Sequence, residues 1–131
     1  MNLNTQDDGL HFARLALDGS TCETLVPAIR GSGHPTLHPN GQHLLTDAYV
    51  DEPLAFGDGT APIRLIDLRS GSETQLVRIG IQPLAERATG ALRVDPHPAG
   101  DRTYTRIAFN ACPDGKRRVF VADLADILRQ R

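Results

Sequence analysis

Two histidine–proline pairs are the residues of this chain whose type and spacing best suit metal chemistry. His34 precedes Pro35 and His97 precedes Pro98, and the two histidines are 63 positions apart (97 − 34 = 63). Asp95 lies two residues before His97, so its side chain projects from the same short extended segment. Two imidazoles and a carboxylate are a common ligand set for manganese, iron or zinc, with positions left open for a substrate. His34, Asp95 and His97 are therefore the candidate metal ligands, and a divalent metal is the expected cofactor.

Arg93 is the candidate substrate-binding residue. It lies two residues before Asp95, and a guanidinium can bind a carboxylate through two parallel hydrogen bonds. A structural alternative stays open for His34, which could instead hydrogen-bond a neighbouring strand without any metal. Two other histidines, His38 and His43, flank a Pro-Asn-Gly turn and are expected to face solvent.

A repeat must position these residues. Asp47 and Asn110 are also 63 positions apart (110 − 47 = 63), so two separate features keep one register. Asp47 and Asn110 themselves are expected to cap turns or to pair across repeats. A second motif, a β-prone run that begins with Arg-Leu or Arg-Val and leads to a Gly or Asp turn, starts at Arg14, Arg64 and Arg118. The pattern predicts no helix longer than about three turns, and strands at 10–17, 21–26, 43–48, 63–68, 72–77, 106–111 and 118–123.

These strands predict an all-β fold, a β-propeller fragment of about two and a quarter four-stranded antiparallel blades. The whole chain, 1–131, is expected to form one partial propeller domain, with blade pieces at about 10–26, 34–77 and 97–124. Two stretches rich in Gly, Pro and charge, 51–62 and 81–92, are interpreted as loops between blades. A small β-sandwich built from the same strands is the alternative.

A fragment of this size would leave broad apolar sheet faces exposed, because one blade cannot bury both of its faces alone. The remaining blades of a propeller, or self-association, are therefore expected to cover them.

Composition and charge exclude several classes of function. The net charge is −2 and the isoelectric point about 6.2, which argues against a nucleic-acid partner. No run approaches the roughly 20 apolar residues of a membrane span, and the first residues lack the features of a signal peptide. No membrane partner and a cytoplasmic location are therefore expected. Cys22 and Cys112 are expected to be small buried core residues rather than a disulfide or a metal motif.

Some of these motifs resemble a known family. The Gly-Ser-Gly-His-Pro-Thr, Pro-Asn-Gly and Leu-Leu-Thr-Asp-Ala-Tyr segments within 31–49 resemble the blade opening of oligogalacturonate lyase-like propellers. The same is true of Arg-Val-Asp-Pro-His-Pro at 93–98, followed by the hairpin at 114–124. The resemblance covers most of residues 31–124, and its most specific parts are Gly-His-Pro and Arg-x-Asp-x-His-Pro.

The resemblance implies a divalent metal, with manganese the expected ion, held by histidines and a glutamine at one end of the ring. It also implies cleavage of an acidic sugar by β-elimination. His34 and His97 match two of the family's histidine ligands. Asp95 stands where the family has a further histidine, and Leu92 stands at the glutamine position, where it cannot bind a metal. The family's catalytic base would lie in blades outside this chain.

The leading hypothesis is therefore a fragment of an oligogalacturonate lyase-like propeller, incomplete for catalysis on its own, that acts on an acidic oligosaccharide with a metal. Whether the chain is an enzyme stays open, because it shows no convincing base. The alternatives are a non-catalytic propeller module that binds protein or glycan, and a remnant reading frame without activity.

Overall fold

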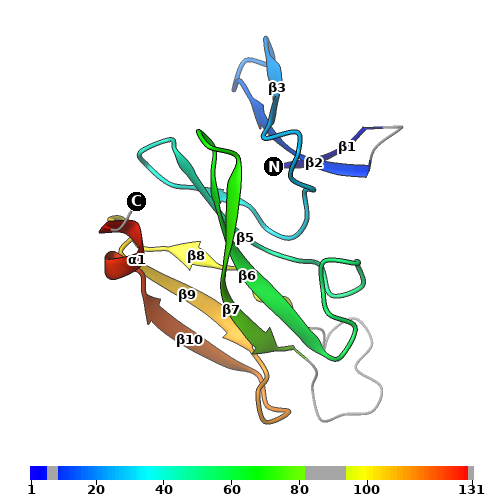
Figure 1. The fold of residues 1–131 in the computed structure, drawn as a ribbon, viewed down its shortest axis with the longest axis vertical. Helices are drawn as coiled ribbons and strands as arrows, with labels where there is room; N and C mark the ends of the chain where they lie inside the picture. Colours follow the sequence, from blue (N-terminus) through cyan, green and yellow to red (C-terminus); the bar gives the residue numbers. More distant parts are fainter. Residues whose placement is uncertain (6–8, 82–93, 130–131) are drawn as a thin grey trace.

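The computed structural model describes residues 1–5, 9–81 and 94–129, and it contains three antiparallel sheets. Figure 1 shows the four-stranded sheet in the middle, between two three-stranded sheets. Within the described residues, no helix is long and apolar enough to cross a membrane. The all-β architecture predicted from the repeat is confirmed.

The first sheet has the order β1-β2-β3, with β1 at Asn2–Thr5, β2 at Gly9–Leu15 and β3 at Cys22–Leu25. Two of these strands were predicted, whereas β1 was missed, because Asn-Leu-Asn-Thr has only one apolar residue and no alternating pattern. Cys22 lies on β3 and is exposed, so its predicted burial is wrong. Its strand forms the outer edge of a sheet that the described residues leave uncovered on that side.

The middle sheet has the order β4-β5-β6-β7. Its strands are β4 at Thr36–Leu37, β5 at His43–Asp47, β6 at Thr60–Asp67 and β7 at Ser72–Gly80. Every residue of β5 and six of the eight residues of β6 are buried. A strand buried on both faces needs a neighbour on each side, as a blade within a propeller has.

His43, the first residue of β5, is buried like the rest of the strand and is only 8% exposed. Its ring nitrogen Nδ1 lies 3.1 Å from the side-chain amide of Asn40. The prediction that His43 faces solvent is therefore wrong. The loop after β5 differs from its prediction as well: it joins β5 to β6 inside one sheet, and 60–62 already belong to β6. The loop at 81–92 lies outside the described residues after Ile81.

The third sheet has the order β10-β9-β8, with β8 at Ala99–Gly100, β9 at Arg106–Ala111 and β10 at Arg118–Asp123. Strands β9 and β10 have the predicted bounds. The chain then forms one short helix, α1 at Ala125–Arg129, whose first amide is capped by the Asp123 carboxylate at 2.8 Å.

Two apolar cores lie on opposite sides of the middle sheet. Successive side chains of a strand point to opposite faces, so Leu44 packs toward the first sheet and Leu45 toward the third. Leu44 joins Phe12 and Ile66 in the smaller core, and Leu45 joins Phe109 and its neighbours in the larger one. Full burial of a side chain of this size contributes about 1.5–3 kcal/mol, so these two contacts hold the three sheets together.

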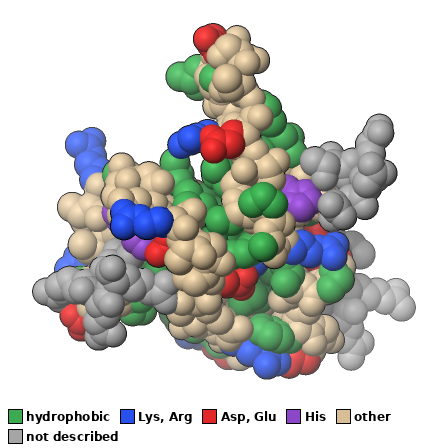
Figure 2. Space-filling view, turned by 45° about the horizontal axis from the view of Figure 1, so that its top comes forward, with side chains coloured by type: hydrophobic (Ala, Val, Ile, Leu, Met, Phe, Trp, Pro, Cys, Tyr) green, Lys and Arg blue, Asp and Glu red, His purple; other side chains and the backbone are tan. Residues whose placement is uncertain are grey.

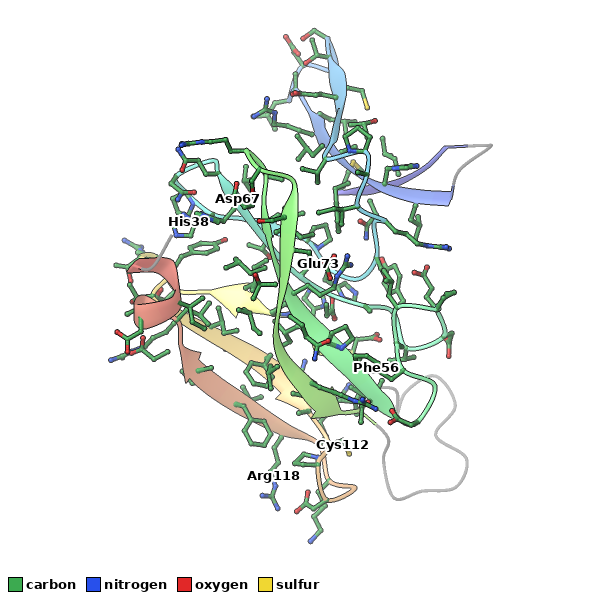
Figure 3. The ribbon with its side chains drawn as sticks, in the orientation of Figure 1. His38, Phe56, Asp67, Glu73, Cys112 and Arg118 are labelled. Carbon is green, nitrogen blue, oxygen red and sulfur yellow. The ribbon has the colours of Figure 1, made fainter. Side chains whose placement is uncertain are left out.

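The side chain of Arg64, which is buried, also links the middle sheet to the first. Arg64 on β6 is 1% exposed. Its guanidinium donates two hydrogen bonds of 2.8 Å to Glu73 on β7 and one of 3.2 Å to the Arg30 carbonyl. It also lies 5.9 Å from the centre of the Phe12 ring. The hydrogen bond from Arg64 lowers the pKa of Glu73, whose position on β7 is marked in Figure 3.

Candidate functional site

The two histidines of the repeated His-Pro motif lie side by side. The His34 and His97 rings are stacked, with centroids 3.9 Å apart and planes inclined by 16°. His34 lies just before β4 and His97 just before β8, the equivalent places in two adjacent sheets. The prediction that the two imidazoles converge because the segments are repeat equivalents is confirmed.

Asp47, the last residue of β5, holds both histidine segments. Its carboxylate is fully buried. Oδ1 accepts the His34 main-chain N–H at 2.6 Å, and Oδ2 accepts the His97 main-chain N–H at 2.8 Å. The His34 ring nitrogen Nδ1 lies 3.1 and 3.2 Å from the two oxygens. One carboxylate therefore joins two adjacent sheets, which confirms that Asp47 pairs across the repeat.

Gly33 is the residue that lets His34 approach this carboxylate. Its φ angle is +70°, in the left-handed region, and a Cβ atom there would overlap Oδ1 and the main-chain carbonyl of Asp47. A side chain at this position would thus be strained and would collide with buried atoms. Steric exclusion of any side chain at position 33 therefore explains why the Gly-His-Pro motif begins with glycine.

His97 carries backbone strain. Its φ angle is +46°, which side-chain-bearing residues rarely adopt. A non-glycine residue in this region costs on the order of 1–3 kcal/mol, and such residues cluster at ligand-binding and catalytic sites. The hydrogen bond from its N–H to Asp47 holds it in this conformation, with its side chain exposed to solvent.

The loop before His34 is fastened from three sides. The Ser32 hydroxyl donates to Glu52 at 2.8 Å and accepts the Tyr49 N–H at 2.9 Å. The Thr46 hydroxyl donates to the Ser32 carbonyl at 2.9 Å. The Tyr49 ring meets the edge of His34, with centroids 5.3 Å apart. His34 is therefore held by its ring contacts as well as by its main chain.

The described residues include no group of three or more His, Cys, Asp or Glu side chains arranged to hold a metal ion. Asp95 is half-buried, and its main-chain carbonyl accepts a 3.2 Å hydrogen bond from Asn110. The metal role of His34, Asp95 and His97 stays a prediction. Arg93 and Leu92 lie outside the described residues.

The pair of histidines nevertheless suits cation binding in one respect. A histidine that binds a metal through one ring nitrogen commonly donates its other N–H to a carboxylate. His34 has this arrangement when Nδ1 carries the proton and donates to Asp47, which leaves Nε2 as its acceptor nitrogen. Sequence reasoning named His34 and His97 but missed that Asp47 is the carboxylate beside them, although the 63-residue register had singled it out.

Among the comparisons with known proteins, the one with solved structures finds a similarity, and it concerns the fold alone. Neither a protein-family model nor a curated protein matches the sequence. The structure is similar to the crystal structure of TolB from Acinetobacter baumannii, with a TM-score of 0.62 and 16% sequence identity. The similarity covers 91% of this chain and 25% of the TolB chain. This chain is a β-propeller fragment, matching part of the TolB propeller domain.

Proposed function

We propose that this chain belongs to an oligogalacturonate lyase-like propeller and that His34 and His97 bind a divalent cation where two blades meet. Manganese is the expected ion, and an acidic oligosaccharide the expected substrate of the complete propeller. The observation that supports this is that equivalent positions of two sheets bring two imidazoles together and that one buried carboxylate fastens both segments. The two rings are stacked, so one of them has to turn before a nitrogen of each can bind the same ion.

The proposal gives each residue of the candidate site a defined role. Asp47 orients His34 by accepting its Nδ1–H, so that Nε2 is available as a ligand. The strained backbone of His97 places the second imidazole against the first. Arg93 would bind a substrate carboxylate through two hydrogen bonds. A bound cation would stabilise the negative charge that develops when a proton is removed next to a uronate carboxylate. Asp95 is the proposed carboxylate ligand of the same ion, and a base would come from outside the described residues.

Calorimetric titration of manganese and zinc into the chain tests the proposal. His34→Ala and His97→Ala should each abolish binding. Alanine at position 97 is as unfavourable as histidine in the left-handed conformation, so this variant removes the imidazole and leaves the backbone strain in place. His38→Ala is the control, because His38 is another partly buried histidine that lies outside the stacked pair. Equal binding by all four proteins, or no binding by the wild type, would make His34 and His97 structural residues.

A non-catalytic propeller module that binds protein or glycan is the second candidate. It is favoured by the absence, among the described residues, of three side chains arranged to hold a metal ion and by the structural use of Asp47, which accepts main-chain N–H groups from two sheets. Binding of oligogalacturonate and of a neutral oligosaccharide, each measured with and without EDTA, separates the two. The metal proposal expects acidic sugar to bind only without EDTA, whereas a glycan-binding module binds in both conditions.

A further inference from the structure

Strand β10 forms an open edge of the third sheet. In the order β10-β9-β8 it is the last strand, and no described residue pairs with its outer side. Its repeat equivalent in the middle sheet, β6, pairs along that side with β7 over eight positions. The third sheet therefore has one strand fewer than the middle sheet at this edge, as Figure 1 shows.

The exposed face of β10 is apolar. Val119 and Val121 are each 70% exposed, while Phe120 between them stacks on Phe109 with centroids 5.9 Å apart. Figure 2 shows hydrophobic side chains on the molecular surface next to charged ones. An edge strand with exposed valines is a template for pairing with another strand.

The outward main-chain groups of β10 can be assigned. The Leu124 N–H donates to the Thr105 carbonyl at 2.7 Å, toward β9. Main-chain groups alternate in direction along a strand, so the N–H and C=O groups of Val119 and Val121 point away from β9. The two exposed valines are thus also the residues whose main chain is available for a new ladder.

The sequence of this edge is complementary to itself. When two β10 strands run antiparallel about a two-fold axis at Phe120, Val119 faces Val121 of a second copy, and Val121 faces Val119. Arg117, the residue before β10, then comes opposite Asp123 at both ends of the four valines. Moving the register by two residues would instead set Val119 against Asp123. The arrangement centred on Phe120 pairs apolar with apolar and positive with negative side chains.

We propose that two copies of this chain associate by antiparallel pairing of their β10 edges, in the register that sets Val119 against Val121. The pairing extends each third sheet across the two-fold axis and covers the exposed valines. We assign a second copy of this chain to the edge because the two valines, together with Arg117 just before β10 and Asp123 at its end, are complementary to their own antiparallel image.

Sedimentation measured over a range of concentrations tests the association. Val121→Lys should raise the dimer dissociation constant at least tenfold. Val77→Lys, at a partly exposed valine on the outer strand of the middle sheet, should leave it unchanged. Circular dichroism checks that each variant is folded. A wild-type chain that stays monomeric, or a dimer that Val121→Lys leaves intact, would overturn the proposal.

Two mixing experiments test the register. Arg117→Glu and Asp123→Lys should each weaken self-association, while a mixture of the two should associate, because both end pairs are then opposite in charge. Asp123 also caps α1, so the folding of the lysine variant is checked first. In a Cys22→Ser background, Val119→Cys mixed with Val121→Cys should form a disulfide, since directly paired Cα atoms lie about 5.5 Å apart. Crosslinking of Val121→Cys to itself, with none in the mixture, would refute this register.

Discussion

Replacing Asp47 by Ala should destabilise the protein strongly, since this carboxylate joins the two sheets at the candidate site. It is fully buried and accepts the main-chain N–H groups of His34 and His97. Leaving one buried donor without a partner costs about 1–3 kcal/mol, so two such donors give about 2–6 kcal/mol. His97 is exposed, and water entering beside it would partly replace the lost acceptor. We therefore expect a loss of about 2–4 kcal/mol.

Asp47→Asn is the second variant, and it still gives a measurable loss of stability if the alanine variant fails to fold. The amide keeps one oxygen as an acceptor but presents an NH2 donor to the other N–H. We expect a loss of about 1–2 kcal/mol, close to one unsatisfied donor. Urea unfolding followed by circular dichroism measures both values, provided that the dependence of the unfolding free energy on urea concentration is the same for the wild type and the variants.

The control for this prediction is Asp58→Ala. The Asp58 carboxylate accepts hydrogen bonds from Thr60 and pairs with Arg78, but its side chain is 51% exposed. Exposed ion pairs contribute about 0–1 kcal/mol, so this change should be small. A loss below about 1 kcal/mol for Asp47→Ala, or one equal to that of the control, would show that Asp47 does not hold the two histidine segments together.

Two further changes probe the same framework. Gly33→Ala should destabilise the chain by about 3 kcal/mol or more in urea unfolding, because it adds a buried collision to the cost of a left-handed backbone; Gly71→Ala, at φ +67° with open space around it, should cost only about 1 kcal/mol. Equal losses for the two would show that the collision with Asp47 is not real. The pKa of Glu73 is lowered from its ordinary value of 4.5 by its hydrogen bonds with Arg64, so its stabilising contribution is present above that value and is lost as the pH falls through the lower, folded-state pKa. Unfolding at pH 6 and pH 3.5 should therefore differ more for the wild type than for Glu73→Gln, and an equal difference would contradict the role of this ion pair.

The sequence alone determined the parts of this protein that depend on local pattern and on the repeat. The repeat and the β-prone runs between turn residues placed β9 and β10 at their observed bounds, because equivalent segments of a repeat form equivalent strands. The 63-residue register brought His34 and His97 together, because equivalent positions in adjacent repeats occupy equivalent places. Strands β1, β4 and β8 carry too little pattern to be found: β1 is mostly polar, and β4 and β8 have two residues each.

Only the tertiary structure decided which carboxylate accepts hydrogen bonds from the two histidines. Asp95 is the nearer to His97 in sequence, yet Asp47 makes the contact, 50 residues away from His97 and 13 from His34. The burial of His43 and the pairing of Arg64 with the Arg30 carbonyl are likewise set by neighbouring sheets. Sequence spacing places residues along one strand, whereas a buried polar group finds its hydrogen-bond partner between strands and sheets, in whichever group the packing brings within about 3 Å.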